Sequence, residues 1–93
     1  MRKCLKIHVT GGVHDNSYCL FVQKHAQGLS IEGSIQGSGD DNVLIYACGA
    51  SDSLEKFIDL LYKGSPEFKI DDVMAEPLMQ ERDFRGAFRI ISQ

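Results

Sequence analysis

The sequence predicts an α+β protein in which an antiparallel sheet carries two helices on one face. Three observations lead to this fold class. Several stretches alternate apolar and polar residues, which is typical of half-buried strands. Two others, near residues 18–27 and 52–63, carry apolar residues at helical spacing. The elements follow the order β-α-β-β-α-β with one further strand, and 93 residues suffice for a single domain spanning 1–93.

The first half of the chain contains three of the expected strands and the first helix. The stretch LKIHVT, residues 5–10, alternates Leu, Ile and Val with polar residues. Apolar residues at helical spacing follow up to Ala26, and Gly28 stands where a helix is expected to stop. Residues 29–36 alternate again, and the turn formers at 37–42 connect them to a strand at 43–48.

The second half begins with a helix whose two ends are marked in the sequence. Asp52 and Glu55 form a plausible capping pair at its start. Lys63, Gly64 and Pro66 mark its end, because glycine caps helices and proline prevents their continuation. The stretches IDDVMAEPL and AFRII then indicate a fourth and a final strand. This order predicts a ferredoxin-like sandwich (βαββαβ), whose helix-free sheet face meets water.

Composition and charge exclude several classes of protein. The formal net charge of −3 argues against a nucleic-acid partner, because phosphate backbones favour clustered Lys and Arg. No apolar run approaches the roughly 20 residues that span a bilayer, so no membrane association is expected. Cys4, Cys19 and Cys48 do not have the spacing of a metal site. We therefore expect reduced thiols, a cytoplasmic location, no metal and no cofactor.

A glycine-bearing loop, GGVHDNSYC at residues 11–19, precedes the first expected helix. Such a loop commonly holds an anion, because free backbone N–H groups and the helix dipole point outward there. This loop, however, contains the acidic Asp15 and neither Lys nor Arg. It therefore looks like a phosphate-binding loop that has lost the groups needed to bind phosphate.

The chain also resembles the acylphosphatase family. Val9, Gly11 and Val13 fit the family signature V-x-G-x-V-Q-G-V-x-F-R, and LFVQKHA is similar to the first turns of the family's first helix, Y-F-V-Q-x-x-A. GASDSLEKFIDLLYKGSPEFKIDDV resembles G-x-x-x-x-V-x-x-F-I-x-x-L-x-x-G-P-x-x-A-x-V-x-x-V, and AFRI resembles the final G-F-x-I. The likeness spans residues 5–90 without insertions.

The resemblance implies a catalytic arginine and a catalytic asparagine that this chain lacks. In the family, the arginine and the loop amides bind the substrate phosphate, and the asparagine positions the attacking water. The gap-free register places Cys19 at the arginine position and Gly37 at the asparagine position. The degenerate anion loop consists of His14, Asp15, Asn16, Ser17 and Tyr18.

Other catalytic arrangements remain open from the sequence. Gln36 or Asn42 could supply the missing carboxamide, whereas Lys24 lies a full helical turn from the arginine position. Cys19 with His14 could form a nucleophile pair, although a small residue filling the arginine's place is the favoured interpretation. His8, His14 and Cys19 match no familiar metal site.

The open face of the sheet is a second candidate site. Strand parity assigns to the helix side Leu5, Ile7, Val9, Val43, Ile45, Ala47, Val73 and Ala75. The opposite face then carries His8, Leu44, Tyr46, Met74 and Leu78. An unidentified protein partner or a second copy of the chain could dock there; scattered surface residues, or a cover from the C-terminal segment, are the simpler alternatives.

Cys4 and Cys48 share the parity of the open face. They lie on strands expected to be antiparallel neighbours, so their β-carbons could approach within about 5.5 Å. Because a reducing environment is expected, the sequence predicts that the thiols lie close together without forming a bond.

Two functions remain after these observations. The first is an acylphosphatase-like domain that is catalytically inactive and serves in binding or association. The second is an acylphosphatase with a rebuilt or weakly active site. The absent arginine and asparagine favour the first.

Overall fold

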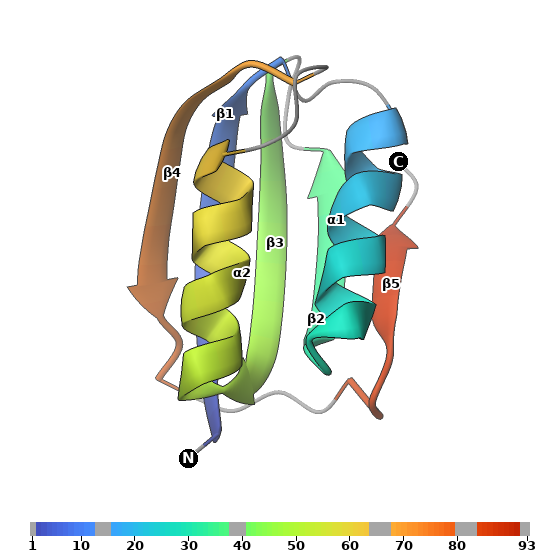
Figure 1. The fold of residues 1–93 in the computed structure, drawn as a ribbon, viewed down its shortest axis with the longest axis vertical. Coiled ribbons are helices and arrows are strands. Elements are labelled where there is room, and N and C mark those ends of the chain that lie inside the picture. The colour runs from blue at the N-terminus through green and yellow to red at the C-terminus, as the bar shows by residue number, and fades with distance from the viewer. Residues whose placement is uncertain (1, 13–15, 38–40, 64–67, 80–83, 92–93) are drawn as a thin grey trace.

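A computed structural model describes residues 2–12, 16–37, 41–63, 68–79 and 84–91. The elements are β1 (Arg2–Gly11), α1 (Asn16–Gly28), β2 (Glu32–Gly37), β3 (Asn42–Ala50), α2 (Ser51–Lys63), β4 (Ile70–Pro77) and β5 (Phe88–Ile91). Both helices cover the same face of one five-stranded sheet (Figure 1). The predicted ferredoxin-like α+β architecture is confirmed, and both helices begin and end within two residues of the expected bounds.

The strands are ordered β4-β1-β3-β2-β5. All neighbouring pairs are antiparallel except β2 and β5, which are parallel, so the expectation of a fully antiparallel sheet was wrong for this strand. The reason is topological. After β4 the chain passes to the opposite edge at the same end of the sheet and returns in the opposite direction, which is the direction of β2 (Figure 1).

The core lies between the sheet and the two helices. Tyr18, Val22 and Ala26 of α1 are buried there, as are Leu54, Phe57 and Leu61 of α2, at the spacing of one helix face. The strands contribute residues of the predicted helix-side parity, with Ile7, Val9, Val43, Ile45, Ala47 and Val73 all buried. Leu5 packs against this cluster, whereas Ala75 on the edge strand β4 is exposed.

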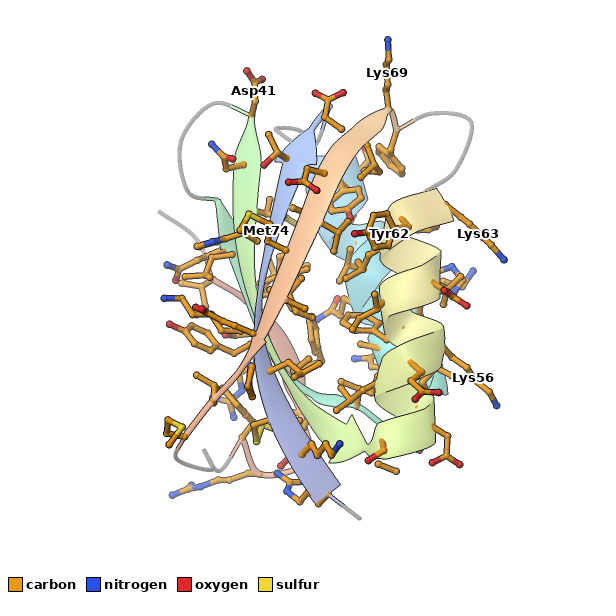
Figure 2. The ribbon with its side chains drawn as sticks, turned by 90° about the vertical axis from the view of Figure 1, so that its left-hand side faces the viewer. Asp41, Lys56, Tyr62, Lys63, Lys69 and Met74 are labelled. Carbon is orange, nitrogen blue, oxygen red and sulfur yellow. A yellow bond between two sulfur atoms is a disulfide. The ribbon has the colours of Figure 1, made fainter. Side chains whose placement is uncertain are left out.

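Two side-chain contacts attach peripheral elements to the sheet. The Tyr62 hydroxyl on α2 donates a hydrogen bond to the Val73 carbonyl of β4 at 2.9 Å, and Figure 2 shows this side chain between the helix and the strand. The Gln23 carboxamide on α1 donates to the Phe88 carbonyl of β5, also at 2.9 Å. Each helix is therefore hydrogen-bonded to the edge strand that it covers.

Gly33 is required for the close pairing of β2 with β3. Its φ is +155°, and a Cβ built there would lie 1.8 Å from the Tyr46 carbonyl oxygen. We expect Gly33→Ala to lower the free energy of unfolding by about 3 kcal/mol or more, because two backbones must separate. Gly28→Ala is the matched control, since a Cβ at Gly28 has no neighbour within 4 Å. Urea unfolding of both variants checks this, and equal midpoints would contradict it.

Candidate functional site

The candidate anion loop lies where β1 ends and α1 begins, and only parts of it are described. Val13, His14 and Asp15, and the side chain of Asn16, lie outside the described residues. The Gly11 N–H donates to the Asp41 carbonyl at 2.9 Å, and the Gly12 N–H donates to the Lys69 carbonyl at 2.8 Å. These two amides are therefore bonded to the protein itself and are not directed at a ligand.

Gly11 also fixes how the chain enters the loop. Its φ is +139°, and an added Cβ would lie 2.3 Å from the Lys69 carbonyl oxygen. Only glycine fits this conformation without displacing the start of β4. The glycine of the family signature is thus explained by backbone packing.

Cys19, which the sequence resemblance predicts at the arginine position, lies in the first turns of α1 and is only 8% exposed. It belongs to the hydrophobic core, and burial raises the pKa of its thiol. A raised thiol pKa lowers the thiolate fraction near neutral pH, so the helix N-terminus does not activate this cysteine. The buried position of Cys19 therefore disfavours its use as a nucleophile.

Gly37, which the sequence resemblance predicts at the asparagine position, ends β2. It pairs with Val43, whose side chain is buried on the helix side of the sheet, so a side chain at position 37 would point toward the helices. Gln36 and Asn42 have the opposite parity, because they pair with Leu44 and Thr10. The Asn42 carboxamide oxygen accepts a hydrogen bond from the Thr10 hydroxyl at 3.1 Å. Neither carboxamide can replace the missing asparagine from that face.

Of the two loop residues whose side chains are described, Ser17 is exposed and Tyr18 is fully buried. The Tyr18 ring meets Phe68 edge-on, with centroids 5.2 Å apart, and its hydroxyl has no hydrogen-bond partner among the described residues. Burial, with a smaller contribution from Cys19, raises the pKa of Tyr18. Tyr18 is a core residue, and its hydroxyl is not available to an anion at the surface.

The sheet separates the residues that were considered for metal binding. His8 has the parity of the open face, whereas Cys19 lies on the helix side. Within the described ranges, no three His, Cys, Asp or Glu side chains are grouped so that they could hold a metal ion.

The open face brings together four of its five predicted residues. His8 pairs with Met74 on one side and with Leu44 on the other, and Tyr46 lies two residues further along β3. A small hollow of about 90 Å³ lies between Lys6, His8, Met74, Ala75 and Glu76. Leu78 lies apart, beyond the end of β4, where its N–H donates to the Cys4 carbonyl at 3.0 Å.

Cys4 and Cys48 are directly opposite each other on β1 and β3, with Cα atoms 4.1 Å apart, and they form a disulfide. Their predicted proximity is confirmed, and the prediction that no bond forms is wrong. The physical reason is the register. The Cys4 carbonyl points away from β3 and accepts a hydrogen bond from the Leu78 N–H, just beyond β4. Toward β3, Cys4 therefore forms a non-hydrogen-bonded pair, in which side chains are closest. Because Cys4 and Cys48 are bonded, reduced thiols no longer support the expectation of a cytoplasmic location.

A thiol titration tests the disulfide and the burial of Cys19 together. The chain has three cysteines, of which Cys19 is free and buried. We expect no rapidly reacting thiol in the folded protein, one after unfolding without reductant, and three after unfolding with reductant. A rapidly reacting thiol in the folded protein would contradict the buried position of Cys19.

A polar cluster at the other end of α1 was not found from the sequence. The Glu32 carboxylate is buried, forms an ion pair with Arg2 and accepts a hydrogen bond from the Gly86 N–H. With Gln27, Ser30 and Ile31 these residues line a cleft of about 370 Å³. No pattern in the sequence indicates this cluster, because it depends on how the turn at Arg85 and Gly86 meets β2.

The described part of the chain has no helix long and apolar enough to cross a membrane. Its fold defines the class of small α+β sandwiches in which two helices cover one face of a five-stranded sheet. The acylphosphatase family model matches residues 5–90, and the chain belongs to the acylphosphatase family.

Individual relatives agree with this family. The acylphosphatase of Thermotoga maritima is 30% identical over 79 residues, covering 85% of this chain and 88% of that one. The acylphosphatase of Bacillus licheniformis is 35% identical over 71 residues, covering 76% and 79%.

Solved structures show the same architecture. The acylphosphatase from Coxiella burnetii superposes with a TM-score of 0.88 at 27% identity, covering 97% of this chain and 93% of that one. The acylphosphatase from Bacillus subtilis gives 0.88 at 26% identity, covering 98% and 99%. The chain is also similar to 12% of the HypF protein of T. kodakarensis, at 28% identity and a TM-score of 0.82. Domains of this kind therefore also occur within larger proteins.

Proposed function

We propose that this chain is an acylphosphatase-family domain that does not hydrolyse acyl phosphates at a useful rate and serves in binding or association. The observation that carries the proposal is the state of Cys19, a buried thiol with a raised pKa at the position of the family's phosphate-binding arginine. A guanidinium binds phosphate oxygens through two charge-assisted hydrogen bonds, and a thiol offers no substitute. Each such bond contributes about 1.5–3 kcal/mol.

Two other residues support the same conclusion. Gly37 has no side chain to position water, and positioning is most of what such a site contributes to catalysis. Asp15 replaces a glycine of the family signature. A carboxylate about 5 Å from a phosphate would add a repulsion of roughly 3 kcal/mol at an effective dielectric near 20.

The second candidate is an acylphosphatase with a rebuilt site. The observation that favours it is Lys69, whose backbone carbonyl is bonded to the Gly12 N–H at 2.8 Å and whose exposed side chain lies at the same end of the sheet (Figure 2). An ammonium there could supply part of the charge that the missing arginine provides.

One experiment separates the two candidates. Hydrolysis of benzoyl phosphate is measured beside a calorimetric titration with inorganic phosphate, on the unchanged chain and on Lys69→Ala. The proposed function predicts no hydrolysis above background and no saturable phosphate binding for either protein. Hydrolysis that is lost in Lys69→Ala would establish the rebuilt site instead.

A further inference from the structure

Two parallel rows of residues on the open face of the sheet each cross all five strands. Because the strands are in continuous register, one residue from each strand lies side by side in a row. The first, the Met74 row, consists of Met74, His8, Leu44, Gln36 and Ile91. The second, the Glu76 row, consists of Glu76, Lys6, Tyr46, Ser34 and Arg89.

The residues at the two ends of each row differ between the rows: those of the Met74 row are apolar, and those of the Glu76 row carry opposite charges. The Met74 row carries exposed apolar side chains at both edges of the sheet, with Met74 64% and Ile91 44% exposed, and Leu44 half-buried at its centre. In Figure 2, Met74 lies on the side of the sheet away from the helices. The Glu76 row carries an exposed carboxylate on β4, an exposed guanidinium on β5 and Tyr46 at its centre.

This arrangement is complementary to itself. A two-fold axis along β3, lying between two facing sheets, places β4 of one copy over β5 of the other. Met74 then faces Ile91 of the second copy, and Glu76 faces Arg89 of the second copy. Leu44 and Tyr46 meet their own counterparts at the centre. An axis perpendicular to the strands would instead place β4 over β4 and β5 over β5, and Glu76 would then not meet Arg89 of the second copy.

We propose that the open face is a self-association surface on which a second copy of this chain docks with β4 over β5. Sheets pack face to face with their strands within about 30° of each other, so this arrangement is an ordinary one. Lys6 holds the Glu76 carboxylate at 4.0 Å within its own chain and would face the uncharged Ser34 of the second copy. This proposal rests on the binding role proposed above. It adds the identity of the partner, which is a second copy of this chain.

The size of the open face limits the affinity expected between two copies of the chain. Five strands spaced by about 4.8 Å span about 19 Å between the outer strands. A face of this width corresponds to the small end of specific interfaces, near 1,200 Å² in total. We therefore expect a monomer–dimer equilibrium with a dissociation constant in the micromolar range or above, measurable by sedimentation equilibrium.

Charge reversal tests the docking arrangement. In Arg89→Glu, residue 89 meets Glu76 of the second copy, and in Glu76→Arg, residue 76 meets Arg89. Each reversal acts twice in a symmetric dimer, so each variant alone should associate at least about tenfold more weakly. In an equimolar mixture of the two variants, opposite charges meet at both ends of the interface. The mixture should associate within about threefold of the unchanged chain.

The control is Lys56→Glu, which makes the same charge change as Arg89→Glu on the outer side of α2 (Figure 2). It should leave association unchanged. A monomeric unchanged chain at several hundred micromolar would overturn the proposal, as would single variants that associate normally or a mixture that is not restored. Sedimentation is read independently of hydrolysis. A dimer that hydrolyses acyl phosphate would contradict only the loss of catalysis, and an inactive monomer would contradict only the docking.

Discussion

Cys19→Arg combined with Asp15→Gly restores phosphate binding, and adding Gly37→Asn gives hydrolysis of acyl phosphates. This result is expected because the arginine returns two charge-assisted hydrogen bonds and the Asp15 change removes a nearby negative charge. At about 1.5–3 kcal/mol per bond, affinity for phosphate should rise by about 10² to 10⁴. Calorimetric titration with inorganic phosphate measures the first step, and release of phosphate from benzoyl phosphate measures the second.

The intermediate variants act as controls. Gly37→Asn alone should neither bind nor hydrolyse, because without the guanidinium no phosphate is held beside the asparagine. Cys19→Arg alone should bind more weakly than its combination with Asp15→Gly. If all three changes together leave the chain unable to bind phosphate while it remains folded by circular dichroism, the assignment of these positions is wrong.

Removal of the Cys4–Cys48 disulfide should produce the largest loss of stability. The two cysteines are 44 residues apart in the sequence, and closing a loop of that length in the unfolded chain is worth about 4 kcal/mol. For a domain of this size the midpoint of thermal unfolding should fall by about 15–30 °C. Scanning calorimetry of Cys4→Ala/Cys48→Ala beside the unchanged chain measures the difference.

Cys19→Ala is the matched control, since it also removes a buried thiol but leaves the cross-link intact. Added reductant should destabilise the unchanged chain and Cys19→Ala, but not the double variant. If reductant has no effect on the unfolding of the unchanged chain, the disulfide does not contribute in the way proposed.

Most of the fold follows from alternation and helical spacing in the sequence. Ile7, Val9, Val43 and Ile45 were assigned to the core by parity alone, and all are fully or almost fully buried. The parallel placement of β5 could not be predicted, because its neighbour depends on where the chain crosses after β4.

Less of the candidate site could be predicted from the sequence. The positions of Cys19 and Gly37 followed from the family register, but the burial of Cys19 depends on tertiary packing. Gln36 and Asn42 remained candidates until the register of β2 and β3 placed them on the other face. Strand parity predicted that Cys4 and Cys48 lie close together. The disulfide itself could not be predicted, because it depends on which backbone hydrogen bonds the two residues make.

The hydrogen bond between Tyr62 and Val73 has a consequence for the outer edge of β4. The bond from the Leu78 N–H to the Cys4 carbonyl shows which residues of β4 face β1, so Val73, Ala75 and Pro77 direct their backbone groups away from the sheet. The Tyr62 hydroxyl already occupies the Val73 carbonyl, and Pro77 has no N–H to offer. Two of the groups that an added strand would need along this edge are therefore not available, which disfavours the addition of a further strand at β4.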